Sequence, residues 1–524
     1  MVFTTLEFLI FFCIVFAVYY IVPKKIQWLV LLVASMYFYT CASLDYIIYL
    51  LAATVITYLG ALLIDKYRHN KEFFFTRYKD ELPKRNKKIF KERIQNRKKI
   101  ALVLTIASTL GILIVVKYSK FAFDNISAVL NIFHINFNTP SWNLILPLGI
   151  SFYTFMSIGY VLDVYREECK AEKNFLKYLL YISYFPHILQ GPMDKYNEVK
   201  DELFSGKSFN YDKAVIGVYR IVVGIIKKMV VADKLALIIS TALGSINDYH
   251  GINIIYILVL YAIQLYADFS GYMDIAIGCS KLLGIDIKEN FDAPYFSKSI
   301  AEYWRRWHIS LGAWFRDYVY YPLLRSKNAE KIRKKYKDKD NKFLSNNMPT
   351  VYALAILWLL IGFWHGSTWS FVIYGLFHGS IIIASTLLQP LYEKFYKRHP
   401  IFIKTEFYSA FQIARTFSLV LLGYLLFCTQ GDLGLSMNMF KNIFVSGESN
   451  KYIFDLMNQD TKTSVILGTG IIFVLDWIKI HGIDVYESLR KKNIVFRWIV
   501  YSLGLFVAIM FASGTVKEFL YFQF

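Results

Sequence analysis

The sequence predicts an all-α protein that crosses the membrane many times. Of its 524 residues, 56% are hydrophobic and 18% are aromatic, and the mean hydropathy is +0.39. These values lie well outside the range of ordinary globular domains. Apolar runs of about 20 residues, the length that a spanning helix needs, also recur along the chain. We therefore expect an integral membrane protein.

About eleven segments have the length and apolar character to cross or enter a bilayer. Five of them lie in the first third of the chain: Val2–Val22, Ile26–Ser43, Tyr46–Ile64, Ile100–Val116 and Trp142–Leu162. Six follow later: Ile252–Leu283, Val351–Phe363, Trp369–Leu388, Phe407–Phe427, Val465–Ile480 and Ile494–Ala512. The first segment has no basic residue ahead of it and no small-residue cleavage site, so we expect a retained span rather than a signal peptide.

The basic residues of the chain are concentrated in two blocks between apolar runs. The chain has 59 Lys and Arg against 39 Asp and Glu, a formal net charge of +20. The blocks lie near residues 65–99 and 325–349, and positive charge is typical of cytoplasmic loops. We interpret them as a topology signal rather than as a nucleic-acid surface. Three apolar runs precede the first block, which places the N-terminus outside if each run spans.

Two middle segments are too polar or too interrupted to be simple spans. Residues 174–196 carry Pro186, Gly191 and Pro192 within an apolar stretch, which predicts a re-entrant or interfacial element. Ile300–Leu324 mixes charged residues with tryptophans, which indicates an interface or a buried helix rather than lipid contact. We find no internal repeat and no soluble module. The sequence therefore predicts one membrane domain over residues 1–524.

Two histidines lie in stretches that otherwise read as membrane, His308 and His365. A titratable ring is costly in hydrocarbon, so it usually faces a protein-lined cavity and serves a pathway or a reaction. His308 precedes the second basic block by 17 residues, and His365 follows the re-entry point near Thr350 by 15. At about 1.5 Å per helical residue, both rings could reach a similar depth from the cytoplasmic face. Either ring could instead be a core histidine bonded to a carbonyl group.

A second polar cluster interrupts the apolar run that begins at Ile252. Its members are Asp268, Ser270, Tyr272 and Asp274. Carboxylates within a span must find partners, and Arg305 and Arg306 in the next polar segment are the candidates. We favour a buried ion-pair network over catalysis here, since residues six apart share a helical face poorly.

Motifs for other chemistry are missing from the sequence. The five cysteines show no metal-ligand or disulfide spacing, and we expect no metal site. Hydrolase, zinc-protease and phosphate-loop motifs do not occur around the polar residues. Histidine chemistry in a membrane cavity remains, and a neutral imidazole can take a proton from a hydroxyl that attacks a carbonyl. A transporter with a proton relay through His308, Asp268 and His365 is one alternative, and a non-enzymatic membrane scaffold is another.

Several runs together resemble the membrane-bound O-acyltransferase family. They are LYADFSGYMDIAIGCSKLLGI, NFDAPYFSKSIAEYWRRWHISLGAWFRDYVYYPL, YFPHILQGPMDKY, FWHGSTWSFVIYGLFHG and the terminal YFQF. The likeness covers nearly the whole chain in order. It is greatest to the bacterial branch that contains the alginate O-acetylation protein and the D-alanyl transfer protein of teichoic acid synthesis.

The resemblance implies an architecture and a role for each histidine. A ring of tilted helices would surround a central tunnel, where a cytoplasmic acyl donor meets an outer acceptor. His365 would be the general base on the acceptor hydroxyl, and His308 would orient or polarise the acyl carbonyl. Further residues would line the tunnel or support it: Asp268, Ser270, Tyr272, Asp274, Arg305, Arg306, Trp304, Trp307, Trp364, His187 and Gln190.

The resemblance also sets expectations for substrates and partners. We expect acetyl transfer from a cytoplasmic donor, acetyl-CoA, to hydroxyls of an extracytoplasmic cell-surface polysaccharide. D-alanyl transfer from a carrier-protein thioester to teichoic acid is the alternative. We expect a multi-pass protein of the cell membrane with no bound cofactor and no nucleic-acid partner. A secreted or small membrane accessory acyltransferase could complete the transfer.

Overall fold

The protein is described by a computed structural model that covers residues 1–524 except 79–82, 138, 140–143, 145, 446–450 and 514–524. Regular structure in these described residues is helical, apart from one isolated antiparallel bridge between Phe291 and Trp307. The all-α prediction is therefore confirmed. By its contacts the chain divides into two compact units: Met1–Ala214 with Ser280–Ile287, and Val215–Cys279 with Lys288–Phe524.

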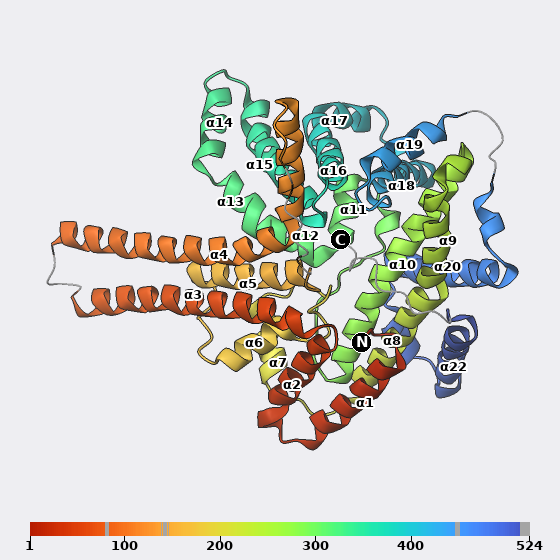
Figure 1. Cartoon of the computed structure of the whole chain (residues 1–524), viewed down its shortest axis with the longest axis horizontal. Coiled ribbons are helices and arrows are strands. Elements are labelled where there is room, and N and C mark those ends of the chain that lie inside the picture. The colour runs from red at the N-terminus through yellow and green to blue at the C-terminus, as the bar shows by residue number, and fades with distance from the viewer. Residues whose placement is uncertain (79–82, 138, 140–143, 145, 446–450, 514–524) are drawn as a thin grey trace. The chain divides into compact units, whose positions relative to one another are not determined.

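Unit 1 is built on helices from the first part of the chain. They are α1 (Leu6–Ile21), α2 (Gln27–Thr40), α3 (Leu44–Arg77), α4 (Lys84–Ile132), α5 (Ile150–Tyr165), α6 (Phe175–Ser183) and α7 (Tyr196–Phe204). α3 and α4 run side by side as a long hairpin (Figure 1). Phe74 and Phe90 stack across it with ring centroids 3.6 Å apart. The first basic block is thus mostly helical and lies in the facing ends of α3 and α4.

Unit 2 holds the remaining helices, two of which extend a few residues into unit 1. They are α8 (Tyr211–Ile225), the π-helix η2 (Ile226–Ala232), α9 (Asp233–Gly244), α10 (Ile252–Leu282), α11 (Ile300–Arg306), α12 (Ile309–Phe315), the π-helix η5 (Arg316–Tyr320), α13 (Tyr321–Leu324), α14 (Lys327–Lys337), α15 (Lys342–His365), α16 (Trp369–Leu387), α17 (Gln389–Arg398), α18 (Glu406–Phe427), α19 (Leu433–Ile443), α20 (Gln459–Ile480), α21 (Val485–Arg490) and α22 (Ile494–Phe511). Short 3₁₀ turns join several of them. α10 is mostly buried, which suits a central helix of this unit.

Eight helices of the described chain are long and apolar enough to cross a membrane: α3, α4, α10, α15, α16, α18, α20 and α22. Each contains one of the segments expected from hydropathy or matches it to within one residue, so a polytopic membrane protein is confirmed. The other expected segments correspond to shorter helices, α1, α2 and α5. α5 begins only at Ile150, after Gly149 in a left-handed conformation, and part of its expected start near Trp142 lies outside the described residues. The terminal YFQF lies outside them as well.

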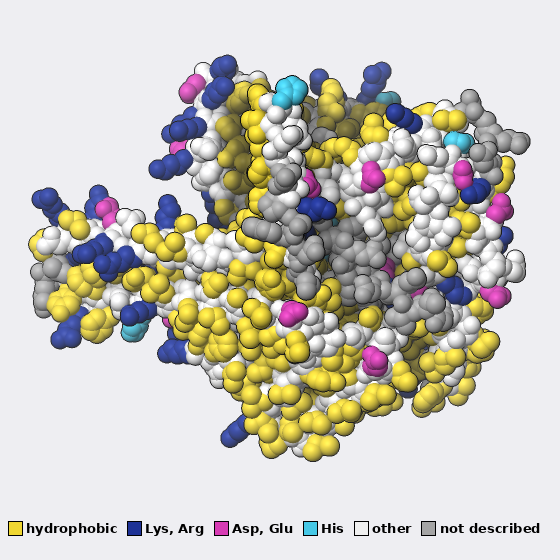
Figure 2. All heavy atoms as spheres, viewed as in Figure 1, with side chains coloured by type: hydrophobic (Ala, Val, Ile, Leu, Met, Phe, Trp, Pro, Cys, Tyr) yellow, Lys and Arg dark blue, Asp and Glu magenta, His cyan; other side chains and the backbone are white. Residues whose placement is uncertain are grey.

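Apolar side chains remain on the surface of the helices that have spanning character. On α1, the side chains of Leu6, Leu9, Ile10 and Ile14 are each more than half exposed. Figure 2 shows apolar side chains gathered over α1, α2 and α3. A soluble protein rarely exposes so large an apolar area, whereas a lipid-facing surface requires it.

The two segments that we expected to be interrupted are not single continuous helices. α6 ends at Ser183, and residues 184–195 after it, which are buried except for Lys195, form turns and irregular chain. Ile300–Leu324 divides into α11, α12, η5 and α13. The break between α11 and α12 falls at His308, so the fold places a predicted functional residue at an irregular point of the backbone.

Candidate functional site

His308 occupies the junction between α11 and α12 in a left-handed backbone conformation, with φ 48° and ψ 56°. For a residue with a Cβ this conformation costs about 1–2 kcal/mol. Such strain persists only where the surroundings hold it, and it is found preferentially at functional sites. The side chain is 1% exposed, and its ring lies edge-to-face against Phe269 of α10 with centroids 4.9 Å apart.

His365 is the last residue of α15, and its ring is 3% exposed. Aromatic rings surround it: the centroids of Trp364, Tyr374 and Phe427 lie 4.9, 5.4 and 5.2 Å away. The helix stops at Gly366, where a Cβ would lie 2.2 Å from the Phe371 ring. Only glycine therefore lets α15 end against α16 in this way, which fixes the position of the histidine before it.

Trp364 joins the two predicted histidines in unit 2. Its ring centroid lies 5.7 Å from that of His308 and 4.9 Å from that of His365. The structure thus brings the two predicted catalytic residues to one tryptophan. They come from different elements, one at the α11–α12 junction and one at the end of α15.

The predicted tryptophans of α11 and its C-terminal end belong to the same aromatic cluster. Trp304 lies 6.4 Å from His365 between ring centroids, and Trp307 lies 5.7 Å from Tyr303. His378 of α16 also joins it, with its ring 5.3 Å from Trp304 and 4.7 Å from Tyr374. His378 is fully buried among these aromatic rings.

A chain of tyrosine hydroxyls braces this cluster. Tyr295 donates to the carbonyl oxygen of Ala262 at 2.7 Å. The Tyr424 hydroxyl lies 3.2 Å from that of Tyr295 and 2.7 Å from that of Tyr303. Because the Tyr295 proton is directed to Ala262, Tyr424 donates to Tyr295 and Tyr303 donates to Tyr424. The chain ties α10, α11 and α18 together, and no hydropathy pattern pointed to it.

Asp268 and Asp274 of α10 take part in buried ion pairs, but not with the cations that we predicted. Lys228 lies 2.6 Å from Asp268 and 2.9 Å from Asp233, measured between nitrogen and oxygen. Asp274 is 2.7 Å from Lys227.

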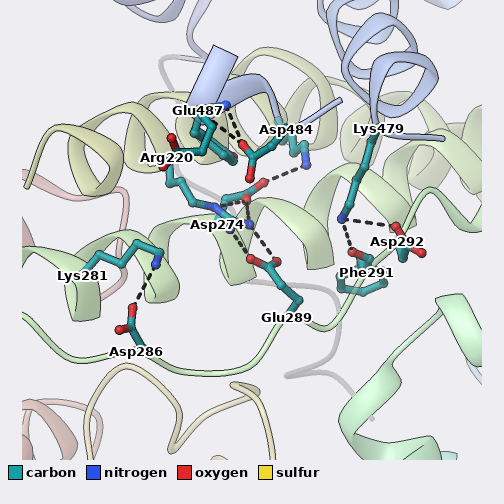
Figure 3. Close-up of polar contacts among 12 residues, drawn as sticks. Arg220, Asp274, Lys281, Asp286, Glu289, Phe291, Asp292, Lys479, Asp484 and Glu487 are labelled. Atoms are coloured by element: carbon teal, nitrogen blue, oxygen red, sulfur yellow. Dashed lines mark hydrogen bonds and ion pairs between the residues drawn. The ribbon is translucent and has the colours of Figure 1, made fainter. Parts of the chain in front are cut away.

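Arg220 completes this network. Its guanidinium lies 2.6 Å from Asp274 and also pairs with Glu289 (Figure 3). The expected partners were wrong: Arg306 bonds Glu302 one turn away on its own helix, and Arg305 is exposed.

The local backbone explains why η2 supplies the cations. A π-helical turn is wider than an α-helical turn, and here the consecutive residues Lys227 and Lys228 are both buried and directed to α10. The α8 backbone also comes close to α10, since a Cβ on Gly224 would lie 2.7 Å from the Gly271 carbonyl oxygen. We had expected Arg305 and Arg306 as partners because they lie in the next polar segment along the chain after the two carboxylates.

The remaining predicted site residues occupy two different places. Ser270 and Tyr272 are buried on α10 in unit 2. His187 and Gln190 are fully buried in unit 1, in the irregular chain after α6. A ring nitrogen of His187 is 3.0 Å from the Tyr181 carbonyl oxygen, so this histidine has a backbone partner. Among the described residues, no three His, Cys, Asp or Glu side chains gather in a way that could hold a metal ion.

Comparison with known proteins gives a consistent set of relatives. A family model described as MBOAT, membrane-bound O-acyltransferase family, matches residues 167–335. A probable alginate O-acetylase AlgI of Azotobacter vinelandii is 33% identical over 74% of this chain and 69% of its own length. The protein of the same description from Pseudomonas syringae pv. tomato is 30% identical over 94% and 84%. A teichoic acid D-alanyltransferase of Bacillus subtilis is 30% identical over 55% and 70%.

Proposed function

Because the chain belongs to the membrane-bound O-acyltransferase family, we propose that it moves an acetyl group from cytoplasmic acetyl-CoA to hydroxyls of a cell-surface polysaccharide. The chain is a multi-pass membrane O-acyltransferase; the donor and the acceptor are the proposed parts. Relatives described as alginate O-acetylases support this choice, since one of them aligns with 94% of the chain. In this proposal the donor reaches the site from the cytoplasm and the glycan reaches it from the opposite side.

The observation that carries the proposal is the pair of buried histidines, His308 and His365, in contact with Trp364. We assign His365 as the general base. Its ring nitrogen takes the proton of the acceptor hydroxyl while the hydroxyl oxygen attacks the thioester carbonyl carbon. The carbon–sulfur bond then breaks, and the proton passes from His365 to the leaving thiolate, so the histidine ends as it began.

His308 serves the acyl group in this mechanism. It orients the thioester or polarises its carbonyl oxygen, where negative charge develops during attack. The aromatic side chains around both rings exclude water, which strengthens such an interaction and disfavours hydrolysis of the thioester. Positioning of the two substrates supplies much of the remaining rate.

D-alanyl transfer to teichoic acid is the second candidate, because a teichoic acid D-alanyltransferase is also 30% identical. Its alignment covers 55% of this chain against 94% for an alginate O-acetylase, which favours acetyl transfer. Both reactions would use the same two histidines with a different thioester. An accessory acyltransferase that completes the transfer outside the membrane fits either one.

The test is the content of alkali-labile ester on cell-surface glycans in cells that carry the wild type or His365→Ala. We expect the variant to lose the ester, and mass analysis of the released acid to identify acetate rather than alanine. His481→Ala is the matched control, since His481 is exposed on the turn after α20. Unchanged ester in His365→Ala cells, with the protein inserted at wild-type level, would overturn the assignment. Released alanine would replace the first candidate with the second.

A further inference from the structure

We propose that Asn290 is a positioning residue for the acyl transfer, which holds the backbone of His308 in its left-handed conformation. This inference rests on the proposed role of His308. Asn290 lies in the connection between α10 and α11 and is fully buried. Asn290 is the first residue of one of the runs that resemble the family, but we predicted no role for it from the sequence.

Asn290 binds the two residues that directly follow His308. Its backbone carbonyl oxygen accepts a hydrogen bond from the Ile309 amide at 3.0 Å. Its side-chain oxygen accepts one from the Ser310 amide at 2.9 Å. The first amide groups of α12 have no partner within the helix, and here one asparagine supplies acceptors for two of them. The start of α12, and with it the direction of the His308 backbone, is set by this residue.

The side-chain nitrogen of Asn290 has a separate partner. It donates to the sulfur of Met273 on α10 at 3.2 Å. The amide therefore faces α12 with its oxygen and α10 with its nitrogen. Phe269, which contacts the His308 ring, lies one helical turn before Met273 on α10. Asn290 thus links the backbone of His308 to the helix that also contacts its ring.

The residues after Asn290 hold the other side of the junction. Phe291 pairs with Trp307 in the isolated bridge, and the Asp292 amide donates to the Arg306 carbonyl oxygen at 3.0 Å. Lys479 of α20 anchors this strand-like segment by donating to the Phe291 carbonyl oxygen at 2.8 Å (Figure 3). His308 is therefore enclosed between bonds to residues 306–307 and bonds to residues 309–310. Of the bonds that residues 290–292 make to the backbone of residues 306, 309 and 310, only the one from the Asn290 side chain can be removed without changing the backbone.

Loss of the Asn290 side chain would leave the Ser310 amide without its acceptor and release the strained turn. His308 would keep its chemistry but lose its placement. A displacement of about 1 Å in a reacting group can lower the rate by about 100-fold. We expect Asn290→Ala to reduce the maximal rate by about 10- to 100-fold, with the apparent KM for acetyl-CoA unchanged.

The experiment measures ester formation by the full chain in membrane vesicles that contain the cell-surface glycan, with radiolabelled acetyl-CoA as the probe. Four forms are compared: wild type, Asn290→Ala, His308→Ala and the double variant. If Asn290 acts through His308, the double variant has the rate of His308→Ala alone, because effects in one unit do not add. Additive losses would overturn the proposal. Met273→Leu is the matched control; it removes the bond to the sulfur and should keep most of the rate.

A second measurement separates this inference from the proposed function. Hydrogen exchange of the purified full chain, read on peptides that cover residues 309 and 310, should rise in Asn290→Ala and stay low in Met273→Leu. If exchange rises while His308→Ala keeps the wild-type rate, the role of His308 in catalysis is wrong but the turn is held as described. If exchange does not rise, Asn290 does not hold the turn and the inference fails. If Asn290→Ala does not insert, Asn290→Asp, which keeps the acceptor for Ser310, should insert and retain the low exchange.

Discussion

Two regions of unit 2 bury titratable groups in opposite ways. On α8, η2 and α10, cations and carboxylates form direct pairs, such as Lys228 with Asp268 at 2.6 Å. At the junction of α11, α15, α16 and α18, His308 and His365 lie among aromatic rings instead. Paired charges satisfy one another and hold helices in register, but they are poorly available to a substrate. The two histidines that we propose for the chemistry lie in the second region, so we expect the first region to serve structure and the second to serve the reaction.

The largest expected effect comes from the second region. His365→Ala should lower the rate of ester formation by at least about 100-fold, the usual contribution of a general base. The protein should still fold and insert, although removal of this buried ring leaves a cavity that lowers the unfolding temperature somewhat. Rate measurements and unfolding of the purified protein check both statements. If the rate fell only as far as the amount of folded protein fell, His365 would serve structure rather than the reaction.

The next effect concerns stability in the first region. Lys228→Met should destabilise the protein by about 3–5 kcal/mol, because it leaves the buried Asp268 and Asp233 without their shared cation. Lys213→Met is the matched control, since Lys213 also pairs at 2.6 Å, with Asp286, but that pair is partly exposed to solvent. We expect the control to lose about 1 kcal/mol or less. Equal losses in detergent-solubilised protein would show that burial of the pair has no consequence.

A smaller effect is expected from the tyrosine hydroxyls that brace the aromatic cluster. Tyr424→Phe removes the hydroxyl that accepts from Tyr303 and donates to Tyr295. Two hydrogen bonds of about 1 kcal/mol each are lost, which should lower the unfolding temperature by a few degrees. The rate should fall only a few-fold, because neither histidine loses a neighbour. A rate as low as that of His365→Ala would instead give the hydroxyl a part in the chemistry.

The smallest effect is expected for Lys479 of α20, which bonds the segment beside His308 from outside the aromatic cluster. Lys479→Met removes the bond to the Phe291 carbonyl oxygen but leaves the Asn290 bonds in place. Lys479 is partly exposed, so the cost should be below about 1 kcal/mol. Hydrogen exchange at residues 309 and 310 should remain low. A rise there would mean that the anchor on α20, and not Asn290, holds the turn.

The sequence predicted what local composition determines. Eight expected segments lie in helices long enough to span, because length and apolar character are local properties. It also named the two histidines that Trp364 joins. It failed at contacts between distant segments: the partners of Asp274 come from α8 and η2, and Tyr374 and Phe427 contact His365 without any signal of spacing. The left-handed backbone of His308 and its support by Asn290 depend on a turn that hydropathy does not describe.

The central claim is that His365 is the base of an acetyl transfer to a cell-surface glycan. The most direct measurement is the radiolabelled acetate that alkali releases from glycans after vesicles are given labelled acetyl-CoA. We predict label on the glycan with wild type and with His481→Ala, and background label with His365→Ala present at the same level. Wild-type labelling by His365→Ala would contradict the account.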